Sequence, residues 1–214
     1  KGIEDGNNYY SLSQTRSRSA AFFANATYSY KGRYTVNGTA RYEGTNRMGK
    51  SRSARWLPTW NVSGAWNAHE EKFFSNLTSV LSHFTLKASY SLTADVTNSQ
   101  AIITSYSPYR PFTSIQESGL YIKELENSEL TYEKKHELNI GADMGFLNNR
   151  INLAVDWYKR NNYDLIGIVN TQGAGGQILK YANIASMKSH GIEFTLSTKN
   201  IKTKDFNWNT DFIF

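Results

Sequence analysis

The residues with the clearest potential for ligand chemistry lie between residues 93 and 129. Aromatic rings and one guanidinium occur close together there, at Tyr106, Tyr109, Arg110 and Phe112. Aromatic rings can stack on sugar faces, and a guanidinium can hold a carboxylate through two hydrogen bonds. These four residues are therefore candidate contacts for an oligosaccharide or a peptide. The alternative is that the aromatic side chains fold a long loop onto itself.

No combination of residues predicts catalysis. The sequence contains no cysteine, which excludes disulfides, cysteine-based zinc sites and cysteine nucleophiles. Solvation in a turn accounts for the adjacent carboxylates of Glu70 and Glu71, and the glycines of residues 173–176 lack the Lys-Ser/Thr pair of a phosphate loop. We expect no catalytic residue, no metal and no cofactor. The histidines lack metal-ligand spacing such as HExxH: His69, His83, His136 and His190.

The element that organises the rest of the chain is a hairpin expected over residues 130–165. Apolar and polar residues alternate on both sides of residues 147–150. Because successive side chains of a strand point to opposite faces, each strand has one apolar and one polar face. Asn148 and Asn149 tolerate the left-handed backbone of tight hairpins, which makes them the expected structural turn residues.

The same alternation recurs along the chain. Residues 69–83 instead place apolar residues at roughly helical spacing, which predicts a short helix or a compact turn. Residues 93–129 and 163–185 have no sustained period and are expected to be long loops. The remaining expected strands cover residues 19–30, 34–43, 56–67, 84–92, 187–198 and 206–214.

The apolar faces of these strands could cover a protein core or face lipid. The connections alternate between short and long, as in outer-membrane barrels. On the apolar parity, Lys134, Lys159 and Lys188 all fall toward the long-loop ends, and aromatic residues gather near both strand ends. These patterns favour lipid. We predict an all-β fold, a transmembrane antiparallel β-barrel segment with long extracellular loops.

The bulk composition is compatible with such a barrel. Mean hydropathy is −0.56, and no apolar run reaches the roughly eighteen residues of a membrane helix. The net charge of +6 could indicate nucleic acid or anionic lipid, but the basic residues are scattered. We expect outer-membrane lipid and no nucleic acid as a partner. The chain begins at Lys1 without Met and ends within an alternating segment, so we expect it to be part of a longer protein.

Five stretches of the sequence carry a resemblance to a known family. They are RYEG at residues 41–44, the run from Leu57-Pro58 to Phe73-Phe74, LKASY at 86–90, the hairpin over 133–158, and the segment 183–193 ending in Gly-Ile-Glu. They resemble stretches of the SusC/RagA-type TonB-dependent outer-membrane transporters. Two departures are Glu43, where Asp is usual, and His190, where Asn is frequent.

The resemblance implies that residues 1–214 are one partial barrel domain. They would form about eight strands of a 22-stranded barrel, with the plug and the TonB-contacting box elsewhere in the protein. It further implies the outer membrane of a Gram-negative bacterium, import of glycans or peptides energised through the TonB complex, and a SusD-like surface lipoprotein as partner. Two alternatives stay open: a passive porin-like or structural barrel, and a soluble β-sandwich binding module.

Arginine on each face tests the parity assignment. Ile140→Arg and Val155→Arg should block assembly of the full-length protein, because a charge at mid-strand on a lipid-facing side costs roughly 2–4 kcal/mol. Asn139→Arg and Asn152→Arg place the same charge on the opposite face and should be tolerated. Heat-modifiable gel mobility measures assembly. Equal tolerance of the two pairs would refute the assignment.

Overall fold

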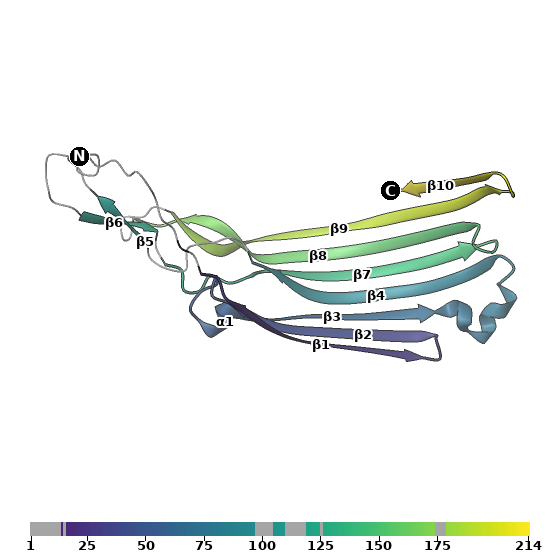
Figure 1. The fold of residues 1–214 in the computed structure, drawn as a ribbon, viewed down its shortest axis with the longest axis horizontal. Helices are drawn as coiled ribbons and strands as arrows, with labels where there is room; N and C mark the ends of the chain where they lie inside the picture. The colour runs from purple at the N-terminus through teal and green to yellow at the C-terminus, as the bar shows by residue number, and fades with distance from the viewer. Residues whose placement is uncertain (1–13, 15, 97–104, 110–118, 125, 174–178) are drawn as a thin grey trace.

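The protein is seen in a computed structural model that describes residue 14 and residues 16–96, 105–109, 119–124, 126–173 and 179–214. Its main element is one antiparallel sheet in the order β1-β2-β3-β4-β7-β8-β9-β10. Figure 1 shows these strands side by side as one layer, with β1 and β10 at its edges. The sheet does not close on itself among the described residues. The predicted all-β, antiparallel fold is confirmed.

Most strands are long. The sheet contains β1 (Ser19–Tyr30), β2 (Tyr34–Thr45), β3 (Trp56–Asn67), β4 (Leu81–Asp95), β7 (Glu133–Phe146), β8 (Ile151–Asn170), β9 (Leu179–Lys202) and β10 (Asn207–Ile213). A separate pair is formed by β5 (Ser105–Tyr109) and β6 (Gly119–Glu124). The helices are short: α1 (Arg52–Arg55) and the 3-10 helices η1 (Ala68–Glu70) and η2 (Lys72–Asn76). No helix of the described ranges is long and apolar enough to cross a membrane.

The register keeps side chains of like polarity on the same face. One row joins Thr27, Asn37, Ser63, Ser89, Asn139, Tyr158 and Gly191. The adjacent row joins Tyr28, Val36, Gly64, Ala88, Ile140, Trp157 and Ile192. Since neighbouring residues of a strand point in opposite directions, these rows define a polar face and an apolar face.

The connections lie at two ends of the sheet (Figure 1). Residues 31–33, 68–80, 147–150 and 203–206 link strands at one end, named here the short-turn end. The links from β2 to β3, β4 to β7 and β8 to β9 leave from the opposite end, the long-loop end. The predicted compact structure over residues 69–83 is present as η1 and η2, although β4 already begins at Leu81.

The prediction of a long loop over residues 163–185 is wrong. β8 continues to Asn170 and β9 begins at Leu179, so the two strands stay paired well beyond the hairpin. The register shifts between Asn162 and Leu165 and again between Leu165 and Ile166. These bulges interrupt the period-two alternation without ending the pairing, which is why the sequence pattern is lost there.

The prediction that residues 93–129 are irregular is also wrong in part. β5 and β6 pair within this stretch, and Pro108 of β5 is the register partner of Leu120. Proline cannot donate to a ladder, but each strand of a two-stranded sheet has a free edge where no donor is needed. The proline therefore did not exclude a strand at this place.

The turn between β7 and β8 uses left-handed backbone at three successive residues. Leu147, Asn148 and Asn149 have φ of 51°, 56° and 58°. Asparagine adopts this region readily, whereas leucine does so rarely. The Leu147 N–H donates to the carbonyl of Val80 at 3.0 Å, so the start of β4 helps to hold the turn.

Most of the buried apolar side chains lie at the long-loop end, and Ala68 and Phe74 are buried in the link at the short-turn end. Met48 and Tyr132 are 0% and 1% exposed and pack with Leu57. The Tyr132 hydroxyl donates to the Arg55 carbonyl at 3.1 Å, which fixes the residues before β7 against α1. A sheet of one layer has a protein core only where loops cover it. Most of the apolar face is left without protein cover.

At the short-turn end, Glu71 ties the link between β3 and β4 to the first hairpin. The Tyr34 hydroxyl donates to Glu71 Oε1 at 2.7 Å, and Arg33 Nη1 donates to Oε2 at 3.2 Å. The hydrogen bond from Tyr34, aided by the charge of Arg33, lowers the pKa of the Glu71 carboxyl, although partial burial acts in the opposite direction. The solvated-turn interpretation of Glu71 misses these contacts.

This arrangement predicts a pH-dependent contribution to stability. Because the pKa of Glu71 is lower in the folded protein, its contribution is present above the ordinary carboxyl pKa of 4.5 and is lost as pH falls through the lowered value. The urea midpoint of the full-length protein should exceed that of Glu71→Gln at pH 6, and the difference should shrink as the pH falls below 4.5. Glu70→Gln is the control. A difference that stays constant with pH would contradict the assignment.

Candidate functional site

The polar face forms a groove of about 590 Å³ across the middle of the sheet. Most of its lining residues lie on the polar parity of β1, β2, β3, β4, β7, β8 and β9, and the small residues Gly64 and Ala88 of the apolar parity also border it. Small hydroxyl and amide side chains make up much of the wall, among them Thr27, Asn37, Ser63, Ser89 and Asn139. Such groups donate and accept hydrogen bonds without a fixed charge. The wall therefore suits polar solutes.

Charged groups of both signs lie among these hydroxyl and amide groups. Lys87 Nζ is 2.9 Å from Asp143 Oδ2 and 3.9 Å from Asp156 Oδ1. Glu137 Oε2 is 2.8 Å from Lys135 Nζ and 3.1 Å from Arg160 Nε. The partners of these ion pairs are partly exposed, so solvent screens their attraction and limits what the pairs contribute to stability. Their consequence is a wall that offers both cations and carboxylates to a bound molecule. The polar ends of a peptide or the hydroxyls of a sugar could replace either partner.

An aromatic platform lies in the same groove. A Cβ on Gly191 would come within 2.7 Å of the Tyr158 hydroxyl oxygen, so the absence of a side chain at Gly191 leaves room for the Tyr158 ring. The Arg160 guanidinium lies over this ring, 4.1 Å from its centroid. This pair is not among the ligand residues predicted from the sequence, although its signal is present there: Tyr158 and Arg160 are two residues apart and therefore share the polar face.

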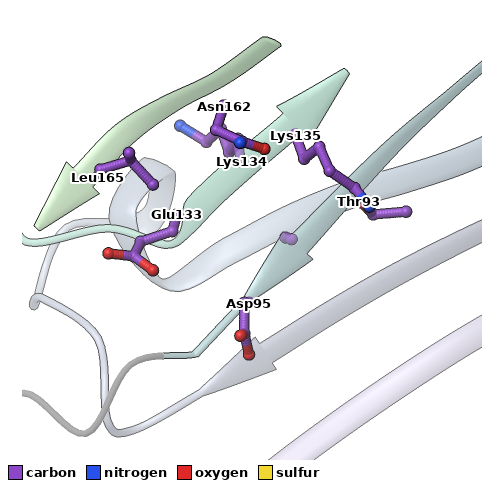
Figure 2. Close-up of a pocket in the computed structure, with 8 residues that line it drawn as sticks. Thr93, Asp95, Glu133, Lys134, Lys135, Asn162 and Leu165 are labelled. Carbon is purple, nitrogen blue, oxygen red and sulfur yellow. The ribbon is translucent and has the colours of Figure 1, made fainter. Parts of the chain in front are cut away.

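A smaller pocket lies where the polar face meets the long-loop end. It has a volume of about 400 Å³ and is drawn in Figure 2. Its lining comes from the end of β4, the start of β7 and the bulged part of β8. The lining residues drawn in Figure 2 include Thr93, Asp95, Glu133, Lys135 and Asn162. The pocket mixes both charges, like the groove.

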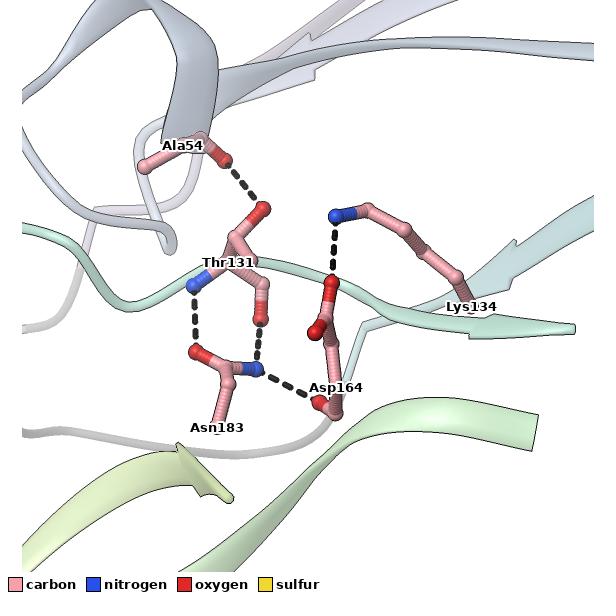
Figure 3. Close-up of polar contacts among 5 residues, drawn as sticks. All are labelled: Ala54, Thr131, Lys134, Asp164 and Asn183. Carbon is pink, nitrogen blue, oxygen red and sulfur yellow. Dashed lines mark hydrogen bonds and ion pairs between the residues drawn. The ribbon is translucent and has the colours of Figure 1, made fainter. Parts of the chain in front are cut away.

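A polar cluster anchors the chain beside this pocket, as shown in Figure 3. Asn183 accepts a hydrogen bond from Thr131 N at 2.9 Å and donates to Thr131 O at 2.8 Å. Its amide also donates to the carbonyl of Asp164 at 2.7 Å. Lys134 Nζ contacts the Asp164 carboxylate at 2.7 Å, and Asp164 has φ of 56°. One side chain thereby takes the place of a strand partner for Thr131.

The structure places only part of the sequence-predicted ligand site. Tyr106 and Tyr109 belong to β5, while Arg110 and Phe112 lie outside the described residues. Their contact with a ligand stays a prediction. Among the histidines, the rings of His69 and His83 lie 4.3 Å apart between centroids. No group of three or more histidines and carboxylates suited to a metal occurs within the described ranges.

Replacing Asn183 should loosen this cluster. Asn183→Ala removes three hydrogen bonds and leaves the Thr131 N–H without its side-chain acceptor, at a cost of about 1–3 kcal/mol. Hydrogen exchange of the full-length protein should become faster in residues 126–132. Asn161→Ala is the matched control, because no side-chain hydrogen bond of Asn161 is described. Unchanged exchange in Asn183→Ala would show that the cluster does not hold this segment.

Comparisons with known proteins agree with this architecture. The family model described as TonB dependent receptor-like, beta-barrel matches residues 2–214. The TonB-dependent receptor SusC of Bacteroides thetaiotaomicron is 29% identical over 205 residues, which is 92% of this chain and 20% of SusC. TonB-dependent receptor P3 of Formosa agariphila is 27% identical over 202 residues, which is 90% of this chain and 19% of that receptor.

A solved structure is similar over the same range. The structure of the RagAB peptide transporter matches with a TM-score of 0.76 and 25% identity, covering 92% of this chain and 22% of the matched chain. The chain thus spans about a fifth of the length of the curated relatives that it matches. With a family match over nearly every residue, the chain belongs to the TonB dependent receptor-like β-barrel family.

Proposed function

We propose that the chain is a wall segment of an outer-membrane transporter that imports oligosaccharides or peptides with energy delivered through TonB. The observation that carries the proposal is the division of one sheet into a polar, charge-balanced face and an apolar face. In this assignment the polar face lines the transport path and the apolar face contacts lipid.

The exposure of the apolar face supports the lipid contact. Phe22, Val36 and Val62 are 69%, 53% and 52% exposed, and all three lie on the apolar parity. A soluble protein rarely leaves so continuous an apolar surface in water. Barrel strands alternate between an apolar outside and a polar inside, as these strands do.

The chemistry of the groove supports a large polar substrate. Tyr158 offers a ring face, Arg160 a cation, and Glu137 a carboxylate, all near one register row. Rings suit the faces of sugars, and paired charges suit the backbone ends and side chains of peptides. The similarity to the RagAB peptide transporter, at 25% identity, supports the peptide option. The similarity to SusC, at 29% identity, supports a TonB-dependent receptor without favouring one substrate class.

The remaining parts of the transporter belong to the proposal too. Residues 1–214 would be a part of the barrel domain, with a plug and the TonB-contacting segment in other parts of the protein. A SusD-like surface lipoprotein would cover the long-loop end, which becomes the extracellular side. The turn at Asn148 and Asn149 is then periplasmic. In this assignment the protein acts as a transporter and not as an enzyme, which agrees with its similarity to TonB-dependent receptors.

Two alternatives were left open by the sequence. A soluble sandwich needs a second sheet against the apolar face, and the eight main strands of the described residues form one sheet only. A passive barrel shares the sheet and both faces with an active transporter. Dependence on energy separates these two.

Uptake by cells that contain the full-length protein tests the proposal. Labelled oligosaccharides and peptides should accumulate in wild-type cells, and accumulation should stop when TonB is deleted or the proton-motive force is collapsed. Uptake that continues by diffusion under both conditions would establish the passive barrel instead.

A bulky side chain in the groove adds a structural control. Asn139→Trp should reduce uptake severalfold, because its side chain projects from the polar face into the path. Ile140→Trp lies on the apolar face, outside the groove lining, and should leave uptake unchanged. Heat-modifiable mobility verifies assembly of both variants. Equal uptake by the two assembled variants would remove the polar face from the transport path.

A further inference from the structure

A basic cluster lies on the apolar face toward the long-loop end. Lys159 of β8 and His190 of β9 are register partners. Asn161 and Lys188 form the next pair whose side chains point to the same face. Lys159, Lys188 and His190 are exposed. Diagonal neighbours on one face of an antiparallel pair have Cα atoms about 7–8 Å apart. The two ammonium groups can therefore reach a single anion.

The two lysines of this cluster have no carboxylate partner in the described part of the chain. The nearby carboxylates of Glu137 and Glu193 alternate onto the polar face and cannot neutralise them. An uncompensated pair of cations on an apolar surface favours an anion supplied from outside the chain. The neighbouring basic residues, in contrast, are paired: Lys134 with Asp164, and both Lys135 and Arg160 with Glu137.

The surface next to the cluster is apolar. Trp157 and Ile192 form the adjacent outward row toward the short-turn end and are 36% and 48% exposed. Tryptophan is enriched where acyl chains give way to headgroups, and lysine extends its charge from such a surface into the polar layer. An occupant that satisfies both parts of this surface carries an anionic group attached to apolar chains.

We propose that Lys159, Lys188 and His190 bind the phosphate of an anionic lipid in the membrane leaflet next to the long-loop end. The lysine ammonium groups donate to phosphate oxygens, and the acyl chains of the lipid cover Trp157 and Ile192. The inference rests on the proposed membrane location. It adds a lipid site on the outside of the wall, opposite the groove.

Binding of a phosphorylated lipid to the purified full-length protein tests this site. The probe is a bis-phosphorylated lipid A in detergent micelles, with the dephosphorylated lipid as a second arm. Lys159→Gln/Lys188→Gln should weaken binding of the phosphorylated lipid about 25-fold, or about fivefold for each lysine. Lys199→Gln/Lys202→Gln removes the same charge at the short-turn end of β9 and should leave binding unchanged.

The arms separate the possible sources of a result. Lys159→Arg/Lys188→Arg keeps the charge and should retain binding. If Lys159→Gln/Lys188→Gln does not assemble, Lys188→Gln alone should still weaken binding about fivefold. Unchanged affinity in the glutamine variants, equal loss in the control, or equal binding of the dephosphorylated lipid would overturn the site. Displacement by inorganic phosphate at equal concentration would assign the site to free phosphate and also overturn it.

Failure of the site and failure of the proposed function give different results. If TonB-dependent uptake persists while lipid binding ignores the lysines, only the lipid site is wrong. If the full-length protein is monodisperse without detergent, the membrane location is wrong and the lipid site falls with it.

Discussion

The structure depends on one constraint: the main sheet is a single layer, and among the described residues no second layer covers either face. In a two-layer domain, apolar side chains pack between the layers. Here the fully buried side chains Met48, Leu130 and Tyr132 lie under the loops at one end of the sheet. The apolar row from Tyr28 to Ile192 has no such cover. Lipid, which forms no hydrogen bonds with backbone, can cover this face because the strand ladders already satisfy the backbone groups.

The structure gives a physical role to residues in two of the stretches that resemble the transporter family. In RYEG, a Cβ on Gly44 would lie 2.5 Å from the Trp56 indole, which stacks on Tyr42 with ring centroids 5.1 Å apart. In the segment 183–193, Asn183 replaces a missing strand partner with its amide. Both motifs place a side chain where two connections meet at the long-loop end. They shape the long-loop end of the wall.

Parity explains what could be predicted from the sequence. The strands between residues 19 and 67 alternate with Phe23 as an exception, and the pattern gives their bounds except at the end of β2, which continues to Thr45. β8 beyond Asn162 does not alternate, because the bulge at Asp164 depends on the Lys134 and Asn183 side chains that hold it. Such contacts join residues far apart in the chain and leave no local pattern.

The aromatic platform was missed for a different reason. Ligand-binding residues are common in loops, and the residues predicted from the sequence to bind ligand all lie between β4 and β7 rather than on the strands of the main sheet. Tyr158 and Arg160 show that in a barrel wall the strand itself carries the polar chemistry.

The register also explains why a charged residue such as Lys159 can share the apolar face with Val62. One row joins Val62, Tyr90, Leu138 and Lys159, although its first members are apolar and its last is charged. The short-turn ends of the strands shift along the sheet in the same direction. The register row through Tyr30 and Tyr34, at the turn between β1 and β2, crosses β7 at Ala142, and β7 continues beyond this row to Phe146.

Strands of a barrel are tilted from its axis by about 35–45°, so a membrane of constant thickness crosses the register rows obliquely. The apolar belt therefore moves toward the short-turn end from β1 to β9. Lys159 on β8 lies on the long-loop side of the belt. Val62 on β3 belongs to the same register row but lies within the belt. The change from apolar to charged residues along one register row therefore reflects the tilt of the strands. The same tilt brings Lys159 and Lys188 to the long-loop border of an otherwise apolar face.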